Sequence, residues 1–114
     1  MTGPLVLALL ASAAPGAALA AGFEEEGVPI TVEPAEGTPE ALACEAARRA
    51  VLGIGVGGDG DRLALVLAGG PARPYLEAPA TRARSFGHDA ARIAARRPLR
   101  GAGSADRARE PYWG

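Results

Sequence analysis

The chain has 114 residues, a length typical of one domain built around a single hydrophobic core. Its 13 acidic and 12 basic residues nearly cancel, to a net charge of −1. No overall charge therefore draws it to nucleic acid or to an anionic membrane. A single cysteine, Cys44, excludes an intramolecular disulfide, a cysteine-based zinc site and a CxxC redox pair, which favours a reducing compartment.

The charges are unevenly distributed along the chain. Residues 1–57 hold seven acids and two arginines, whereas residues 58–114 hold six acids and ten arginines. A chain with an acidic half and a basic half suits a surface that meets a protein partner.

The apolar run at residues 5–10 has two interpretations. With the small residues 18–20 (ALA) it resembles a signal peptide and its cleavage site. No Lys or Arg precedes the run, however, Pro15 interrupts the segment, and the run is far too short to span a bilayer. The alternative is a buried strand at residues 5–10, followed by a helix that begins near Ser12.

Three carboxylates, Glu24, Glu25 and Glu26, end that helix. The helix is expected over residues 12–22, with Gly27 placed to end it in a left-handed turn. Acids at a helix C-terminus face the negative end of the helix dipole and repel one another. The run is therefore either a solvated acidic helix end or a functional site that compensates for this cost.

The next segments alternate between strand and helix patterns. A β-branched strand is expected at residues 28–32, and a helix then opens at Thr38-Pro39-Glu40 and closes at Arg48 and Arg49. Cys44 lies among alanines on this helix, where a buried small hydrophobe is favoured over a nucleophile.

The second half of the chain begins with two apolar runs, at residues 51–56 and 62–67, on either side of a Gly/Asp turn. The gap is too short for a parallel crossover, so these strands are expected to be antiparallel. A short edge strand is expected at 75–77 and an amphipathic helix over 86–94. The order of elements predicts a three-layer α/β domain with a mostly parallel sheet and one reversed strand, over residues 1–100, followed by a flexible tail at 101–114.

Residues 53–58 (GIGVGG) formally match the GxGxxG dinucleotide fingerprint. The phosphate site of that motif requires a helix N-terminus after the glycines, but here Asp59, Asp61 and a strand follow. A hairpin turn is the favoured interpretation. Asp59 and Asp61 have the chemistry to ligate a hard cation, although an exposed acidic turn is the simpler interpretation.

The last helix carries the single histidine, His88, and a basic C-terminal end. No serine or aspartate near His88 suggests a catalytic triad, so an exposed position in the helix's first turn is expected. The basic end is either a solvated face or a docking surface for an acidic partner; its residues are Arg92, Arg96, Arg97 and Arg100.

Two motifs resemble one known family. Residues 22–29 (GFEEEGVP) closely resemble the G-I-E-E-E-G-[IV]-P signature of the small subunit of diol/glycerol dehydratase reactivase, a relative of the medium subunit of those cobalamin-dependent dehydratases. Residues 84–93 (RSFGHDAARI), with 98–100 (PLR), resemble the family's R-x-x-G-x-N-A-A-R-[LI] helix and trailing P-F-R. The resemblance covers about residues 4–100; His88 and Asp89 depart from the family's usual residues.

The resemblance implies both a fold and a role. The fold is the anticodon-binding-domain type, a five-stranded mixed sheet in the order 2-1-3-4-5 with strand 4 antiparallel. The implied role is that of a chaperone-like protein without catalysis or a cofactor of its own. It would form a heterotetramer with a large actin/Hsp70-like ATPase subunit. By exchanging with the dehydratase medium subunit it would release damaged cobalamin.

The resemblance also implies a site. In this family a glutamate of the acidic run helps to ligate a divalent cation, such as magnesium, at the contact with the large subunit, and by position that is Glu25. Glu24, Glu26 and Arg92 are expected at the same partner interface. Since neighbours on a helix point about 100° apart, Glu24 and Glu26 are expected to point away from the metal.

Three functional classes stay open. The reactivase small subunit is the first, the medium subunit of an adenosylcobalamin-dependent dehydratase the second, and a scaffold that merely shares the fold the third. Dehydratase medium subunits carry an N-terminal extension, and this chain is expected to begin at its first strand, which favours the reactivase. Cytoplasmic localisation is expected, without nucleic-acid or membrane partners.

Overall fold

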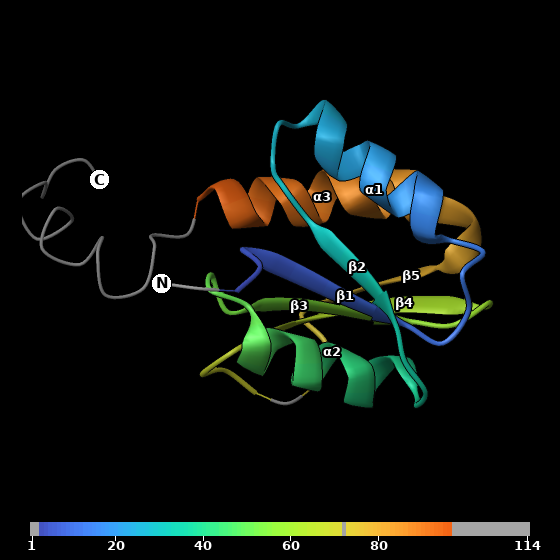
Figure 1. Cartoon of the computed structure of the whole chain (residues 1–114), viewed down its shortest axis with the longest axis horizontal. Coiled ribbons are helices and arrows are strands. Elements are labelled where there is room, and N and C mark those ends of the chain that lie inside the picture. The colour runs from blue at the N-terminus through green and yellow to red at the C-terminus, as the bar shows by residue number, and fades with distance from the viewer. Residues whose placement is uncertain (1–2, 72, 97–114) are drawn as a thin grey trace, which may run out of the picture.

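The computed structural model describes residues 3–71 and 73–96, which form one sheet with helices on both faces (Figure 1). The five strands are β1 (Val6–Leu10), β2 (Thr31–Pro34), β3 (Ile54–Gly58), β4 (Arg62–Leu67) and β5 (Leu76–Pro79). The helices are α1 (Gly16–Glu25), α2 (Pro39–Arg49) and α3 (Ala83–Ala95), the last preceded by a 3₁₀ turn, η1 (Ala80–Arg82).

The sheet has the order β2-β1-β3-β4-β5. Strand β1 pairs in parallel with β2 and β3, whereas β4 is antiparallel to both of its neighbours. The expected order and the reversed fourth strand are therefore confirmed. The apolar run near the N-terminus is the central strand β1, whose five residues are all buried.

The two faces of the sheet are covered differently. Helices α1 and α3 lie side by side on one face and α2 lies alone on the other (Figure 1). The larger core lies under α1 and α3, where Phe23 and Phe86 meet the strand residues Ile54 and Val56. The α2 face is lined mainly by alanines and leucines. Half-buried Cys44 packs there, as expected for a small hydrophobe.

Strand β3 shows why the two faces differ. Alternate residues of a strand point to opposite faces, so Ile54 and Val56 enter the larger core while Gly55 and Gly57 face α2. A Cβ atom at Gly55 or Gly57 would lie 2.1 Å from the backbone of α2. The glycines therefore bring helix α2 against the sheet, and β3 runs directly into the hairpin to β4. The predicted hairpin is confirmed.

Helix α1 begins four residues later than the sequence suggested. Ser12 was expected to open the helix, but its Oγ accepts a hydrogen bond from the Ala14 amide in a turn that precedes Pro15. The residue before a proline is disfavoured in the α region, so the helix starts only at Gly16. Its C-terminal end is as expected: Gly27 has φ +75° and closes the helix in a left-handed turn.

Strand boundaries also shift. Strand β2 begins at Thr31 rather than at residue 28, and it includes Pro34, which an edge strand tolerates. Strand β3 begins at Ile54 rather than at residue 51, because Gly53 adopts φ +71° and turns the chain first. The expected flexible tail at 101–114 lies outside the described residues. Across the described part of the chain, no helix is long and apolar enough to cross a membrane.

Candidate functional site

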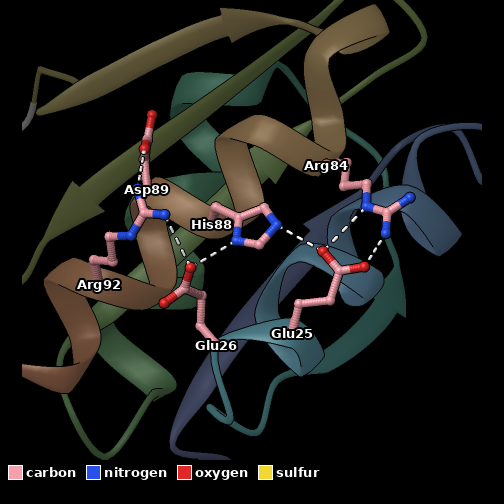
Figure 2. Close-up of polar contacts among 6 residues, drawn as sticks. All are labelled: Glu25, Glu26, Arg84, His88, Asp89 and Arg92. Carbon is pink, nitrogen blue, oxygen red and sulfur yellow. Dashed lines mark hydrogen bonds and ion pairs between the residues drawn. The ribbon is translucent and has the colours of Figure 1, made fainter.

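The acidic end of α1 lies beside α3, where basic side chains meet it (Figure 2). Arg84, His88 and Arg92 are spaced four residues apart, so they share one face of α3. That face is turned toward Glu25 and Glu26. The acidic run is therefore compensated within the chain, by three side chains of a helix about sixty residues away in the sequence. We call these five residues the α1–α3 ionic cluster.

Glu25 is held by two of these side chains. Its Oε1 accepts a hydrogen bond from Arg84 Nε at 3.1 Å and lies 2.6 Å from His88 Nε2. Its Oε2 accepts a second bond from Arg84 Nη2. Two parallel bonds from one guanidinium form a bidentate pair, which fixes the carboxylate plane as well as its charge.

Glu26 is held by the other two contacts of the cluster. Its Oε2 lies 2.7 Å from His88 Nδ1 and 3.0 Å from Arg92 Nη2. The hydrogen bond from His88, with the positive charge of Arg92, holds the pKa of the Glu26 carboxyl below its ordinary value. Arg92 also donates to Asp89 at 3.3 Å, within α3.

His88 therefore bridges the two carboxylates, one through each ring nitrogen. Both nitrogens donate hydrogen bonds only in the imidazolium form, so this geometry suits a positively charged ring. The expectation of a surface histidine in the first helical turn is wrong, because the side chain is only 27% exposed and lies in the second turn.

The three glutamates separate in an unexpected way. Glu24 is exposed and makes no ion pair within the described part of the chain, as expected for a side chain pointing elsewhere. Glu26 was expected to point away as well, but it lies beside Glu25's partner His88. The regular helix ends at Glu25, and Glu26 is the C-cap with φ −95° and ψ 0°. The 100° spacing of an ideal helix therefore no longer applies at Glu26.

Basic residues of η1 and α3 border an open hollow next to the cluster. It measures about 620 Å³, and its lining includes Arg82, Arg84, His88 and Arg92. Of the residues predicted to form a basic surface, Arg92 pairs with Glu26 of the acidic run. Arg97 and Arg100 lie outside the described residues.

A cation at Glu25 finds only part of a coordination shell in this chain. No group of three or more His, Cys, Asp or Glu side chains gathers to hold a metal ion in residues 3–71 and 73–96. Glu25 itself is 37% exposed and has carboxylate oxygens of the kind magnesium prefers. The described residues therefore offer a cation one exposed carboxylate, that of Glu25.

The glycine-rich segment at residues 53–58 forms no phosphate cradle. Gly55 and Gly57 face α2, Gly53 turns the chain, and Gly58 faces Leu10 and Leu63 of the larger core. The amide of Ala11 donates to the carbonyl of Gly58 at 2.8 Å, which joins the ends of β1 and β3. The following turn is organised by Asp59, whose Oδ1 accepts from the amides of Asp61 and Arg62, both at 2.8 Å. These backbone bonds lower the pKa of the Asp59 carboxyl. Asp59 is a turn residue here, as the simpler interpretation predicted.

A second ionic contact ties this hairpin to α2. Arg62 donates two hydrogen bonds to Glu40, at 2.5 and 3.1 Å. The bond from Arg62 lowers the pKa of Glu40, and Glu40 in turn raises that of Arg62. Glu40 lies in the first turn of α2, behind the Thr38 cap, where an acid also favours the helix dipole.

Sequence reasoning named Glu25, Glu26 and Arg92 but missed Arg84 and His88 as their partners. The signal was present as the four-residue spacing of Arg84, His88 and Arg92, which places all three on one helix face. What the spacing did not reveal was which element this face would meet.

Comparisons with known proteins agree with this architecture. A family model described as dehydratase medium subunit matches residues 6–100. A solved structure of a glycerol dehydratase reactivase is 28% identical, with a TM-score of 0.72, and the match covers 86% of this chain and 96% of that chain. Among curated proteins, no sequence matches.

A second solved structure is a diol dehydratase-reactivating factor complexed with ADP and Mg²⁺. It has a TM-score of 0.68 at 24% identity, with 88% of this chain and 99% of that chain covered. At this identity the likeness shows the fold alone. The family model, together with the match to the glycerol dehydratase reactivase, confirms the family resemblance seen in the sequence motifs.

Proposed function

The chain belongs to the dehydratase medium subunit family, and from this premise we propose that it is the small subunit of a diol or glycerol dehydratase-reactivating factor. The observation that carries the proposal is the match to a glycerol dehydratase reactivase chain, 96% of whose length is covered at 28% identity. In this role the chain has no catalysis of its own. It acts in the cytoplasm as a chaperone-like partner of a large actin/Hsp70-like ATPase subunit.

The proposed action is exchange between two related subunits. A small subunit that shares the fold of the dehydratase medium subunit can take its place, which opens the inactivated dehydratase so that damaged cobalamin leaves. The family model supports this step, because it describes the medium subunit itself and matches residues 6–100 of this chain.

We place the contact with the large subunit at the acidic end of α1, at Glu24 to Glu26, with Arg92 at its border. Glu25 is the proposed ligand of a magnesium ion shared with the large subunit. Its exposed carboxylate fits one position of such a site, and the ligands missing from this chain would come from the partner. Bound there, the ion would bridge the two subunits electrostatically.

The second candidate is the medium subunit of an adenosylcobalamin-dependent diol or glycerol dehydratase, part of an enzyme. The description of the matching family model favours it directly. In that role the chain would stay in the holoenzyme through each catalytic cycle, and it would not need an ATPase partner.

One experiment separates the two candidates. The chain is purified alone and after co-expression with a large ATPase subunit of a dehydratase reactivase. Each sample is added to a dehydratase inactivated by its substrate and, separately, to a dehydratase that lacks its medium subunit. The proposal expects a single complex on size exclusion and recovery of activity only with ATP and fresh adenosylcobalamin. Two separately eluting proteins at micromolar concentration, together with restored activity of a dehydratase lacking its medium subunit, would instead support the second candidate.

A further inference from the structure

The carboxylate of Glu25 is almost fully used inside this chain. A carboxylate offers about four lone-pair sites. Arg84 occupies one on each oxygen, and His88 Nε2 takes another on Oε1 at 2.6 Å (Figure 2). A divalent cation that approaches Glu25 therefore meets one open position and a guanidinium charge beside it.

A hard cation and the Arg84 guanidinium bind the same atoms, the carboxylate oxygens of Glu25. Magnesium binds carboxylate oxygens directly and demands near-octahedral geometry, whereas the bidentate guanidinium covers the same two oxygens from one side. Like charges at this separation repel. The two cations therefore compete for Glu25, and a shared metal site forms only when Arg84 withdraws.

Arg84 is the part of the cluster that is free to move. Its side chain is 63% exposed and is bound only to Glu25 among the described residues. His88 is 27% exposed and is also held by Glu26, which is itself held by Arg92. Withdrawal of Arg84 thus disturbs neither the core nor the Glu26 side of the cluster.

We infer that Arg84 is a positioning residue that occupies Glu25 in the free subunit and must release it to a divalent cation when the large subunit binds. The identity of the partner, the large subunit, rests on the proposed function. The competition between Arg84 and a cation for Glu25 does not, because it takes place within this chain. Exposed ion pairs are weak, so the equilibrium lies within reach of a cation presented by a partner. In the free chain, Arg84 keeps the acidic run neutralised.

The competition is tested first on the isolated chain, with manganese(II) as the probe. Manganese broadens the NMR signals of nuclei near its binding site, so the amides of Glu25 and Glu26 report its occupancy. Arg84→Ala is expected to reach half-broadening at a manganese concentration up to about fivefold lower than the wild type, the upper limit of what an exposed pair supplies. The matched control is Arg48→Ala, which removes one arginine and its exposed pair with Glu45 on the far face of the sheet. It should behave like the wild type.

The double variant Arg84→Ala/Glu25→Gln should not show the lower manganese concentration for half-broadening that Arg84→Ala shows, because it lacks the carboxylate that binds the ion. Equal manganese concentrations for the wild type and Arg84→Ala would overturn the inference. The same spectra show whether each variant keeps the fold, which an exposed substitution should leave intact.

The second test measures the dissociation constant of each variant for the large subunit with magnesium present. Arg84→Ala is expected to bind up to about fivefold more tightly than the wild type and Arg48→Ala. Weaker binding of Arg84→Ala alone would overturn the inference, because Arg84 would then serve the contact. If no variant binds the large subunit, the proposed function fails while the manganese result still decides whether Arg84 competes.

Discussion

Gly22 of α1 and Gly87 of α3 face each other where the two helices cross. A Cβ atom at Gly22 would lie 2.3 Å from the carbonyl oxygen of Arg84, and one at Gly87 would lie 2.5 Å from that of Leu19. Neither distance leaves room for a methyl group. This pair of glycines lets the helix backbones touch, and it thereby brings the acidic end of α1 within reach of Arg84 and His88.

The first prediction is that Gly22→Ala destabilises the protein by about 1–2 kcal/mol. Overpacking a close contact costs about 1–3 kcal/mol, and the better helix propensity of alanine returns up to about 1 kcal/mol. Urea denaturation measures the difference. The control is Gly16→Ala in the same helix, where the added Cβ would lie 3.6 Å from a Leu10 methyl, an ordinary contact. It should be neutral or slightly stabilising, and equal destabilisation by both changes would contradict the role of the crossing.

The crossing also shows what the sequence could and could not predict. The motifs around Gly22 and Gly87 each fall on a helix expected from the sequence. The pattern of elements predicted the reversed strand, and the family resemblance implied the order of the sheet. Their contact was not predicted, because helical spacing defines a face but not the element that the face meets. The compensation for the acidic run was therefore sought in a metal ion, although Arg84, His88 and Arg92 already supply it within the chain.

The second prediction concerns the glycines of β3. Gly55→Ala should destabilise the protein by about 1–3 kcal/mol, because the new methyl would lie 2.1 Å from the backbone nitrogen of Ala47. The matched control is Gly70→Ala, whose Cβ would meet its first neighbour only at 3.5 Å. If the glycines instead served a nucleotide, calorimetry with ATP would show binding to the wild-type chain that Gly55→Ala abolishes, and we expect no such binding.

The starts of helix α1 and strand β3 were both predicted too early, and for the same physical reason. At Ser12 and at residue 51, hydrophobicity and capping residues predicted an early start. Backbone geometry delayed it, through Pro15 in one case and the positive φ of Gly53 in the other. Hydrogen bonds to other parts of the chain also act at such ends: the amide of Val51 donates to the carbonyl of Pro4, just ahead of β1, at 2.8 Å.

The third prediction is loss of stability in acid. The pKa values of Glu26, Glu40 and Asp59 are lowered in the folded chain, so the unfolded chain binds these protons at higher pH. Their contribution is therefore complete above the pKa values of the unfolded chain, above about pH 5, and it is lost as the pH falls through the lowered values of the folded chain. Thermal unfolding measured from about pH 5 downward gives the slope of stability against pH.

A pair of variants isolates the Asp59 contribution to that slope. Asp59→Asn keeps a side-chain oxygen for the amides of Asp61 and Arg62 but does not titrate, so its stability should depend less on pH than that of the wild type. Asp61→Asn is the control, because the Asp61 carboxylate accepts no hydrogen bond from the described residues. Parallel slopes for Asp59→Asn and the wild type would show that the turn does not carry the effect.

The last prediction separates the three glutamates of the acidic run by measuring the dissociation constant for the large subunit with and without magnesium. Glu25→Ala should weaken the complex and remove its magnesium dependence, because the proposed ion loses its ligand from this chain. Glu24→Ala, at an exposed carboxylate without an ion pair in the described residues, should weaken the complex less than Glu25→Ala and should keep its magnesium dependence. Glu26→Ala should instead lower the stability of the free chain, since it leaves His88 and Arg92 without their shared carboxylate. The Glu26→Ala complex should keep its magnesium dependence.

Equal and small effects of all three changes on the complex would mean that the acidic run is a solvated surface held by α3, and the metal assignment at Glu25 would be abandoned.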